Sequence, residues 1–333
     1  MSGIASRQNE ILSKLGFNSY GAREFLPGNL DNEIVVPDIN QYFSDQSIPL
    51  SKVDFVIYDA VVDQTGRGTH LTIQDALNSG KKRIFVRAGT YAPFTIAAAN
   101  TYEGFSIVGE NKHQTIIKIP DNSVNNTRAI SIPIGDAPAL NIEIKNLMIN
   151  GNYANQDSGY TQYGIAASNV VLLKIIDCRV DYVQGYGIYI QNSGFVNIEN
   201  SSIGGNQGES LYLKNSSNFT ISKNSLGGIS GKNGIVLDDC FRMDILDCNI
   251  SEIGTDIANT YSGIVLKNTS FKNKILGNRI VQGVFGSIKY GVREESTSDD
   301  YNIINNSILE GITTEAISTQ GANTIIGAEN LII

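Results

Sequence analysis

One short pattern constrains the fold of this chain more than any other feature of its sequence. The pattern reads Gly-Ile-x-Leu and recurs every 23 to 29 residues through the second half of the chain. The copies GIAAS, GIYIQ, SLYLK, GIVLD, GIVLK, GVREE and AISTQ begin at Gly164, Gly187, Ser210, Gly234, Gly263, Gly291 and Ala316. Each copy is too short to bury its own apolar face, so the copies must stack on one another to form a core.

The alternation within each copy predicts which side chains face that core. Because side chains point to opposite faces along a β-strand, the first aliphatic residue and the residue two positions later should both point inward. These inward columns are Ile165, Ile188, Leu211, Ile235, Ile264, Val292 and Ile317, and Ala167, Ile190, Leu213, Leu237 and Leu266. The outward column between them is Ala166, Tyr189, Tyr212, Val236, Val265, Arg293 and Ser318. We therefore expect an all-β fold, a right-handed parallel β-helix (solenoid), over residues 53–333.

A second segment follows each copy and ends in an aliphatic residue: Val180, Ile203, Leu226, Ile250, Ile280 and Ile308. Two positions before these lie Cys178, Ser201, Asn224, Cys248, Asn278 and Asn306. Small or polar residues at one turn of successive coils stack about 4.8 Å apart, so we interpret this column as an internal ladder. Three cysteines without CxxC spacing favour reduced, structural thiols over disulfides or a metal site. We expect no metal and no cofactor.

Both ends of the chain depart from the repeat. Residues 1–52 lie outside it, and we expect them to form an N-terminal attachment or capping segment with short helices at Ser6–Leu15 and Asp38–Tyr42. Near the other end, Glu294 occupies a position that is inward in earlier copies. Because an unpaired buried charge is costly, the last coils are expected to change register or to lie against a partner.

Composition limits the partners of the chain. A net charge of −8 and a pI near 4.9 oppose binding to nucleic acid or to an anionic membrane surface. The start MSGIASRQNE lacks the features of a signal peptide, and no apolar run approaches the roughly 20 residues that span a bilayer. We expect a protein made in a cytoplasm, without a membrane partner.

The segment before the repeat resembles a known superfamily. Thr72–Asn78 predicts a short N-capped helix that Gly80 ends, which would cover the first coil. The run TGRGTHLTIQDALNSGKKRIFVRAGTY resembles the opening of the pectin-lyase-like right-handed parallel β-helix superfamily, and of phage tailspike and tail-appendage proteins in particular. The resemblance implies fold more than activity, because the superfamily contains lyases, hydrolases, esterases, epimerases and non-catalytic virion fibres.

Enzymes of this superfamily act on the outer face of the strand that carries the repeat. Its last exposed position reads Ser168, Gln191, Lys214, Asp238, Lys267, Glu295 and Gln320. Asp238, Lys214, Lys267 and Glu295 are therefore the candidate catalytic residues of a polysaccharide lyase or glycoside hydrolase. Charges that alternate between coils are also what stacking alone would favour, because like charges repel. We favour this structural interpretation, since the motifs of the polygalacturonases and pectin methylesterases are incomplete.

The same face also predicts a ligand-binding patch. Tyr189 and Tyr212 should stack on neighbouring coils, with Gln191 and Lys214 beside them and Tyr186 in the preceding turn. Aromatic faces next to amide and ammonium donors suit a sugar, whose CH faces stack and whose hydroxyls form hydrogen bonds. Exposed tyrosine is also common on β-sheets for reasons of strand propensity alone.

These observations leave three functions open. The first is a phage virion structural protein, a tailspike-like or fibre-like appendage that recognises host-surface carbohydrate. Such a protein would be located in the virion, where it would form a homotrimer and contact other virion proteins. The second is a polysaccharide lyase, hydrolase or epimerase. The third is a capsid decoration protein. We favour the first and lean against an enzyme.

Overall fold

The computed structural model describes residues 58–97, 104–132, 139–255, 257 and 259–333. The chain divides into two compact units, one ending at Arg87 and one spanning Ala88–Ile333. The predicted boundary after residue 52 and the predicted helices Ser6–Leu15 and Asp38–Tyr42 lie outside the described residues, so they stay predictions.

The described part of the first unit contains two parallel strands and one helix. Strand β1 (Ala60–Val62) pairs with β2 (Arg83–Val86). Helix α4 (Ile73–Asn78) begins at Thr72, whose hydroxyl accepts a 3.0 Å hydrogen bond from the Asp75 amide. The predicted helix is confirmed, and Gly80 follows it with φ +81°.

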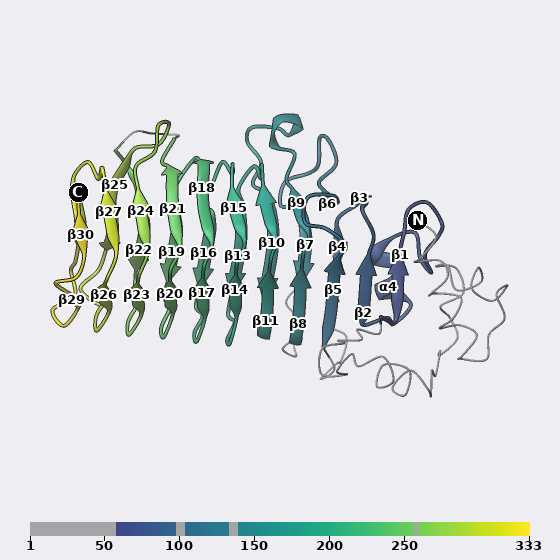
Figure 1. The fold of residues 1–333 in the computed structure, drawn as a ribbon, viewed down its shortest axis with the longest axis horizontal. Helices are drawn as coiled ribbons and strands as arrows, with labels where there is room; N and C mark the ends of the chain where they lie inside the picture. The colour runs from purple at the N-terminus through teal and green to yellow at the C-terminus, as the bar shows by residue number, and fades with distance from the viewer. Residues whose placement is uncertain (1–57, 98–103, 133–138, 256, 258) are drawn as a thin grey trace, which may run out of the picture. The chain divides into compact units, whose positions relative to one another are not determined.

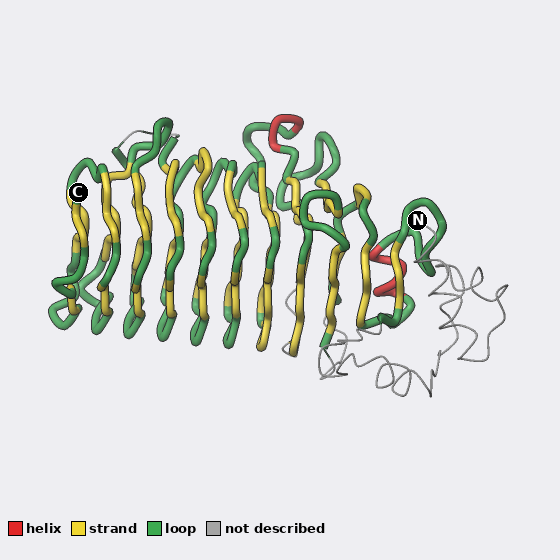
Figure 2. Tube along the Cα trace, in the orientation of Figure 1, coloured by secondary structure: helices red, strands yellow, loops and turns green. Residues whose placement is uncertain are grey.

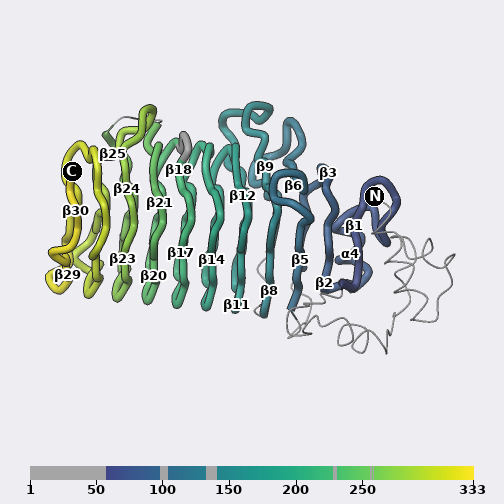
Figure 3. The backbone as a smooth tube through the Cα atoms, in the orientation of Figure 1, coloured from purple at the N-terminus to yellow at the C-terminus, as the bar shows by residue number. Residues whose placement is uncertain are grey.

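The second unit is a right-handed parallel β-solenoid of about ten turns, as the repeat predicted. Its coils stack through three parallel sheets, shown in Figures 1 and 3. Within this unit, sheet A contains, in order, β5 (Phe105–Gly109), β8 (Ala139–Lys145), β11 (Val170–Ile176), β14 (Asn197–Glu199), β17 (Thr220–Ser222), β20 (Asp244–Leu246), β23 (Lys274–Leu276), β26 (Ile303–Asn305) and β29 (Ile325–Ile326).

Sheet B contains, in order, β3 (Gly89–Tyr91), β6 (Thr115–Lys118), β9 (Met148–Asn150), β12 (Arg179–Asp181), β15 (Ser202–Gly204), β18 (Ser225–Ser230), β21 (Asn249–Ile253), β24 (Arg279–Val281), β27 (Ile308–Glu310) and β30 (Leu331–Ile332). Sheet C, which carries the repeat, contains β4 (Phe94–Thr95), β7 (Arg128–Ile132), β10 (Tyr163–Ser168), β13 (Tyr186–Gln191), β16 (Leu211–Lys214), β19 (Ile235–Asp238), β22 (Tyr261–Lys267), β25 (Ile288–Glu294) and β28 (Glu315–Ser318). A 3₁₀ turn, η2 (Tyr153–Asn155), appears red in one of the loops that join the strands in Figure 2.

The glycine of the repeat lies where each coil passes from sheet B to sheet C. A β-carbon on Gly263 would lie 2.5 Å from Cγ2 of Ile280 in sheet B and 2.6 Å from the carbonyl oxygen of Gly291 in the next coil. A β-carbon at the other corner glycines would likewise lie 2.5–2.8 Å from an aliphatic side chain of sheet B and from a carbonyl oxygen of the next coil. These glycines are Gly164, Gly187, Gly234 and Gly291. Five of the seven copies therefore begin with glycine, because a β-carbon at these corners would overlap its neighbours; the other two copies begin with the small residues Ser210 and Ala316.

This crowding predicts the effect of adding one methyl group at the corner. Gly263→Ala should lower the free energy of unfolding by about 1–3 kcal/mol, because backbone or Ile280 must move to admit the β-carbon. The matched control is Gly159→Ala, since a β-carbon at Gly159 meets nothing within 4 Å. Urea unfolding followed by circular dichroism measures both. Equal stability of the two variants would contradict the steric explanation.

The predicted inward columns are confirmed, and the outward column is corrected in part. All members of both inward columns of sheet C are buried. Of the column predicted to point outward, Tyr189, Tyr212, Arg293 and Ser318 are partly exposed. Ala166, Val236 and Val265 are buried instead, at 5%, 2% and 4% exposure. Small side chains on the outer face thus lose contact with solvent where larger neighbours surround them.

The internal ladder forms in continuous register, and its last predicted member lies one residue later than expected. The amides of Cys178, Ser201 and Cys248 each donate to a side-chain oxygen in the next coil, at 2.9–3.1 Å. Burial raises the pKa values of all three thiols, to about 12 for Cys178 and Cys240 and about 11 for Cys248, so they stay protonated. In the last member, Ile308 is 37% exposed and Leu309 is fully buried. The inward pair is therefore Ser307 and Leu309, and the prediction of Asn306 and Ile308 was wrong.

At Glu294 the expected change of register does not occur, and the alternative, a contact with a partner, stays a prediction. The residue stays in register opposite Leu266 and is only 1% exposed. Its carboxylate accepts hydrogen bonds from the Asn302 amide group at 2.8 Å and the Thr324 hydroxyl at 2.7 Å. The backbone amides of Gln320 and Gly321 each donate a further bond of 3.0 Å. Four donors satisfy the charge inside the solenoid, so a register change is unnecessary.

Candidate functional site

Four tyrosine rings gather on the outer face of sheet C. We call Tyr163, Tyr186, Tyr189 and Tyr212 the tyrosine platform. Tyr163 stacks on Tyr186 with ring centroids 5.5 Å apart, and Tyr189 stacks on Tyr212 at the same separation. The two stacked pairs meet edge to face, with Tyr186 lying 5.5 Å from Tyr189 and 5.3 Å from Tyr212. Each ring thus contacts at least two others.

The corner glycines explain why residues three apart share one face. Tyr163 pairs with Tyr186 in the sheet register, and Tyr189 pairs with Tyr212. A β-carbon on Gly187 would point at Ile203 inside the solenoid, so the usual alternation is interrupted between Tyr186 and Tyr189. Both tyrosines consequently lie outside the core, partly exposed.

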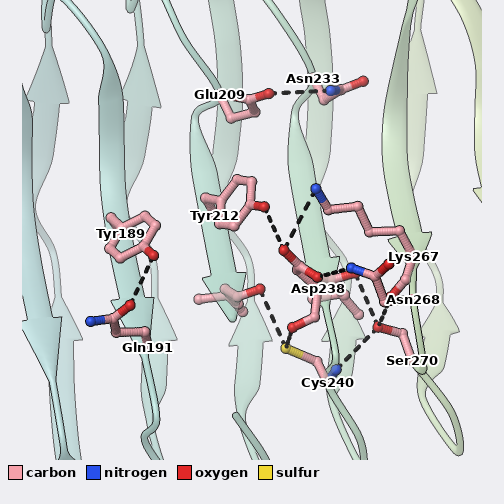
Figure 4. A network of polar contacts seen from close by, with 12 residues as sticks. Tyr189, Gln191, Glu209, Tyr212, Asn233, Asp238, Cys240, Lys267, Asn268 and Ser270 are labelled. Carbon is pink, nitrogen blue, oxygen red and sulfur yellow. Dashed lines mark hydrogen bonds and ion pairs between the residues drawn. The ribbon is translucent and has the colours of Figure 1, made fainter. Parts of the chain in front are cut away.

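Polar and charged groups surround the platform. The Arg128 guanidinium lies 5.7 Å from the centroid of Tyr163, and the Lys267 ammonium lies 5.0 Å from that of Tyr212. The Tyr189 hydroxyl donates a 3.0 Å hydrogen bond to Oε1 of Gln191 (Figure 4). Cations at two edges and an amide beside the rings therefore border an aromatic surface.

Asp238 anchors one end of this surface. Its carboxylate is 5% exposed and accepts a 2.6 Å hydrogen bond from the Tyr212 hydroxyl and another from Asn268, while the Lys267 ammonium lies 3.6 Å away (Figure 4). Burial alone would raise the pKa of Asp238. The hydrogen bonds from Tyr212 and Asn268, with the charges of Lys267 and Lys214, outweigh burial and hold the pKa below its usual value.

Three of these tyrosines, Tyr186, Tyr189 and Tyr212, stay protonated. Burial raises the pKa of Tyr212 far above its ordinary value, and the hydrogen bond to Asp238 raises it further. Burial and the negative charge of Glu209 raise the pKa of Tyr186 to about 12, and burial also raises that of Tyr189. Near neutral pH these three hydroxyls can donate hydrogen bonds, and the phenolate form that could accept a substrate proton is hardly populated.

The structure brings together only part of the predicted catalytic set. Asp238 contacts Lys267 and pairs in the register with Lys214, but it is buried rather than exposed as predicted. Glu295 lies beyond this group, with its carboxylate 3.2 Å from the Arg293 guanidinium. The catalytic role of these four residues stays a prediction.

All predicted ligand-binding residues lie on or beside the platform, and three further members were missed. Tyr163, Arg128 and Asn268 were not predicted. Tyr163 carried a signal, because Tyr-Gly precedes the aliphatic residue at 163–164 and again at 186–187. Arg128 lies in a coil that precedes the first copy of the repeat, and Asn268 lies in the turn after β22. The repeat pattern does not predict which residues face each other at these two places.

Other features lie apart from the platform. A shallow cavity of about 170 Å³ on sheet B is lined by Tyr182, three glycines and the Arg179–Asp181 ion pair, among others. Among the residues that the structure describes, no group of three or more His, Cys, Asp or Glu could hold a metal ion, and no helix is long and apolar enough to cross a membrane.

The low pKa of Asp238 predicts how stability depends on pH. A carboxyl with a depressed folded-state pKa stabilises the fold above its unfolded value of about 3.9, and that contribution disappears as pH falls through the folded value. Asp238→Asn should therefore lose about 1–3 kcal/mol of unfolding free energy at pH 7, and the difference from wild type should shrink below about pH 4.

Urea unfolding at a series of pH values tests this expectation. Asp244→Asn is the matched control, because its carboxylate is 39% exposed and pairs with Lys274 at 3.8 Å on the surface. The control should change stability little at any pH. A loss in Asp238→Asn that is the same at every pH would contradict a charged Asp238 as the cause.

The fold and the site define a parallel β-solenoid with an aromatic surface on one sheet. The family described as the right handed beta helix region matches residues 163–331, just over half of the chain, and the chain belongs to this family. A comparison with curated proteins gave no match.

Solved structures share the fold at low sequence identity. The ORF18 protein of Geobacillus virus E2 is 15% identical with a TM-score of 0.57, and the match covers 78% of this chain and 58% of that one. The Streptococcus pneumoniae surface adhesin PfbA is 16% identical with a TM-score of 0.53, covering 78% and 80%. Full-length tailspike protein 2 of an Escherichia coli O157:H7 bacteriophage is 12% identical with a TM-score of 0.47, covering 76% and 39%. At these identities the likeness concerns the fold alone.

Proposed function

We propose that this protein is a virion structural protein, a tailspike-like or fibre-like appendage whose rigid solenoid presents a carbohydrate-binding surface. The observation that carries the proposal is the tyrosine platform, with its four mutually packed rings on sheet C. A viral protein, ORF18 of Geobacillus virus E2, has the same fold, which supports a role of this kind.

The platform suits a saccharide for physical reasons. Partly exposed rings offer apolar faces to the CH groups of a sugar, and the Gln191 amide and the Lys214 ammonium lie on the same sheet to bond hydroxyls. The rings contact one another and Tyr212 is bonded to Asp238, so the surface is already ordered before a ligand arrives. Preorganisation of this kind reduces the entropy lost on binding.

Removing one ring should weaken saccharide binding. Tyr189→Ala should reduce the affinity for a recognised bacterial surface polysaccharide by about three- to tenfold, the value of one aromatic contact. The matched control is Tyr182→Ala, because Tyr182 is 44% exposed but lies outside the platform. Binding is measured by affinity electrophoresis through gels that contain each polysaccharide of a panel. Equal retention of both variants would contradict the platform as the binding site.

A second candidate function is a polysaccharide lyase, hydrolase or epimerase, favoured by Asp238 with Lys267 and Lys214 beside it. Incubation with the same polysaccharides and assays for new reducing ends or unsaturated uronates distinguish the two functions. Turnover that is abolished in Asp238→Ala and in Lys214→Ala would establish the enzyme. Binding without turnover supports the appendage.

The proposed assembly is a homotrimer that contacts other virion proteins. Light scattering should give three times the chain mass of 36.0 kDa, and antibody labelling of purified virions should mark the tail. A monomer in solution would contradict the trimer. Labelling of the capsid surface would instead favour a decoration protein, the third candidate.

A further inference from the structure

Residues in the left-handed backbone conformation form three lines along the solenoid. One line ends the strands of sheet C and contains only Asn and Asp: Asn169, Asn192, Asn215, Asp239 and Asn268. Another follows sheet A and is almost as uniform: Asn146, Asp177, Asn200, Lys223, Asp247, Gly277 and Asn306. Asn, Asp and Gly adopt a positive φ most readily, so these two lines follow the backbone preference.

The third line, where each coil starts sheet A, does not follow that preference. It contains Asn141, Leu172, Phe195, Asn218, Arg242, Lys272 and Tyr301, with φ between 55° and 64°. Amide-to-carbonyl hydrogen bonds between successive coils keep these residues in one register. Five of the six coils from Leu172 to Tyr301 therefore place a bulky side chain where Asn, as at Asn218, would be less strained.

These bulky side chains do not enter the core. Leu172 is 47% exposed, Phe195 60% and Tyr301 57%, and Arg242 and Lys272 are also exposed. The burial of these side chains is therefore too small to offset the energetic cost of the strained backbone. Strained residues that packing does not explain concentrate at functional sites, where the side chain itself is needed.

The line carries a basic and aromatic surface. Phe241 and Phe271 precede its two cations and stack with centroids 5.4 Å apart. The Arg242 guanidinium lies 5.9 Å from the centroid of Phe241, and the Lys272 ammonium lies 5.8 Å from that of Phe271. No acidic partner is recorded for either cation in the described residues. We call this surface, from Leu172 to Tyr301, the corner strip.

We propose that the corner strip is a second ligand site, which binds a linear glycan bearing acidic groups. The strip follows the solenoid axis for five coil steps of about 4.8 Å each, or about 24 Å, which suits an extended polymer. Its rings would contact the apolar faces of the sugar units, and Arg242 and Lys272 would pair with carboxylates, sulfates or phosphates.

Two other occupants fit the strip less well. In a parallel, symmetric assembly of copies around this corner, each Arg242 and Lys272 would face its own counterpart, and like charges would repel. Duplex nucleic acid carries one negative charge per about 1.7 Å, so the net charge of −8 on the whole chain opposes it more than a glycan with at most one acidic group per sugar. A polyanion with apolar faces and low charge density meets both conditions.

The experiment uses the full chain and three probes: dextran sulfate with fewer than one sulfate per sugar, polygalacturonate, and neutral dextran as the matched backbone. Wild type should bind at least one of the two acidic polymers and not dextran, with an affinity that falls as salt rises. Replacing both cations, in Arg242→Asn/Lys272→Asn, should weaken this binding about tenfold or more. Lys223→Asn/Arg279→Asn removes the same charge elsewhere on the surface and should leave binding unchanged.

Thermal unfolding separates a binding role from a structural one. Because Asn suits a positive φ better than Phe, Phe195→Asn should keep or raise Tm while it weakens polymer binding. The relative affinities for dextran sulfate and polygalacturonate would show whether the strip prefers sulfate or carboxylate groups. The proposal is overturned by failure to bind either acidic polymer, by equal losses in the two double variants, or by a fall in Tm without a loss of binding. Self-association that Phe195→Asn abolishes would also overturn it, in favour of an interface between copies.

The tyrosine platform provides an independent reference in these experiments. Tyr189→Ala should leave binding at the corner strip intact, since Tyr189 belongs to sheet C and shares no recorded contact with Phe241 or Phe271. A loss in Tyr189→Ala with no loss in Arg242→Asn/Lys272→Asn would assign the acidic polymer to the platform and overturn the second site.

Discussion

The close approach of sheet C to sheet B is the constraint on which the rest of the solenoid depends. At the corner between them, a β-carbon on Gly234 or Gly263 would overlap both an isoleucine of sheet B and a carbonyl oxygen of the next coil. The glycine, or the small Ser210 or Ala316 in two of the copies, therefore marks where each coil bends. Once the bends are aligned, the parallel hydrogen-bond register carries every column of side chains through successive coils. The core, the internal ladder and the outer surfaces all follow from this alignment.

The same corner also produces the candidate site. Because the chain bends at Gly187, residues on both sides of the bend reach the outer face, and rings from three coils can pack together. The buried carboxylate of Asp238 then holds the Tyr212 ring in place through a hydrogen bond that is shielded from solvent. A rigid aromatic surface results from backbone geometry and one buried charge, without a deep pocket.

The inward columns could be predicted because burial alternates with a period of two, which a single strand already displays. Contacts between coils could not. The burial of Asp238 depends on Asn268, which is 30 residues away, and no local pattern connects them. The last ladder member was misplaced because Ile308 and Leu309 are both aliphatic, so either could have faced inward. Tyr163 was missed because strict alternation ignores the bend at the glycine.

Glu294 makes the final coils chemically unlike those before them. The coils that begin at Gly187 and Ser210 differ mainly in side chains that repeat the same columns, so each presents nearly the same upper and lower surface to its neighbours. Duplication or loss of one such coil would keep the inner columns continuous, although it would rearrange the tyrosine platform on the outer face. The coil that contains Glu294 requires donors from Asn302, Gln320 and Thr324 and tolerates no such exchange. The buried carboxylate therefore ties the coil of Glu294 to the segments that follow it in the chain.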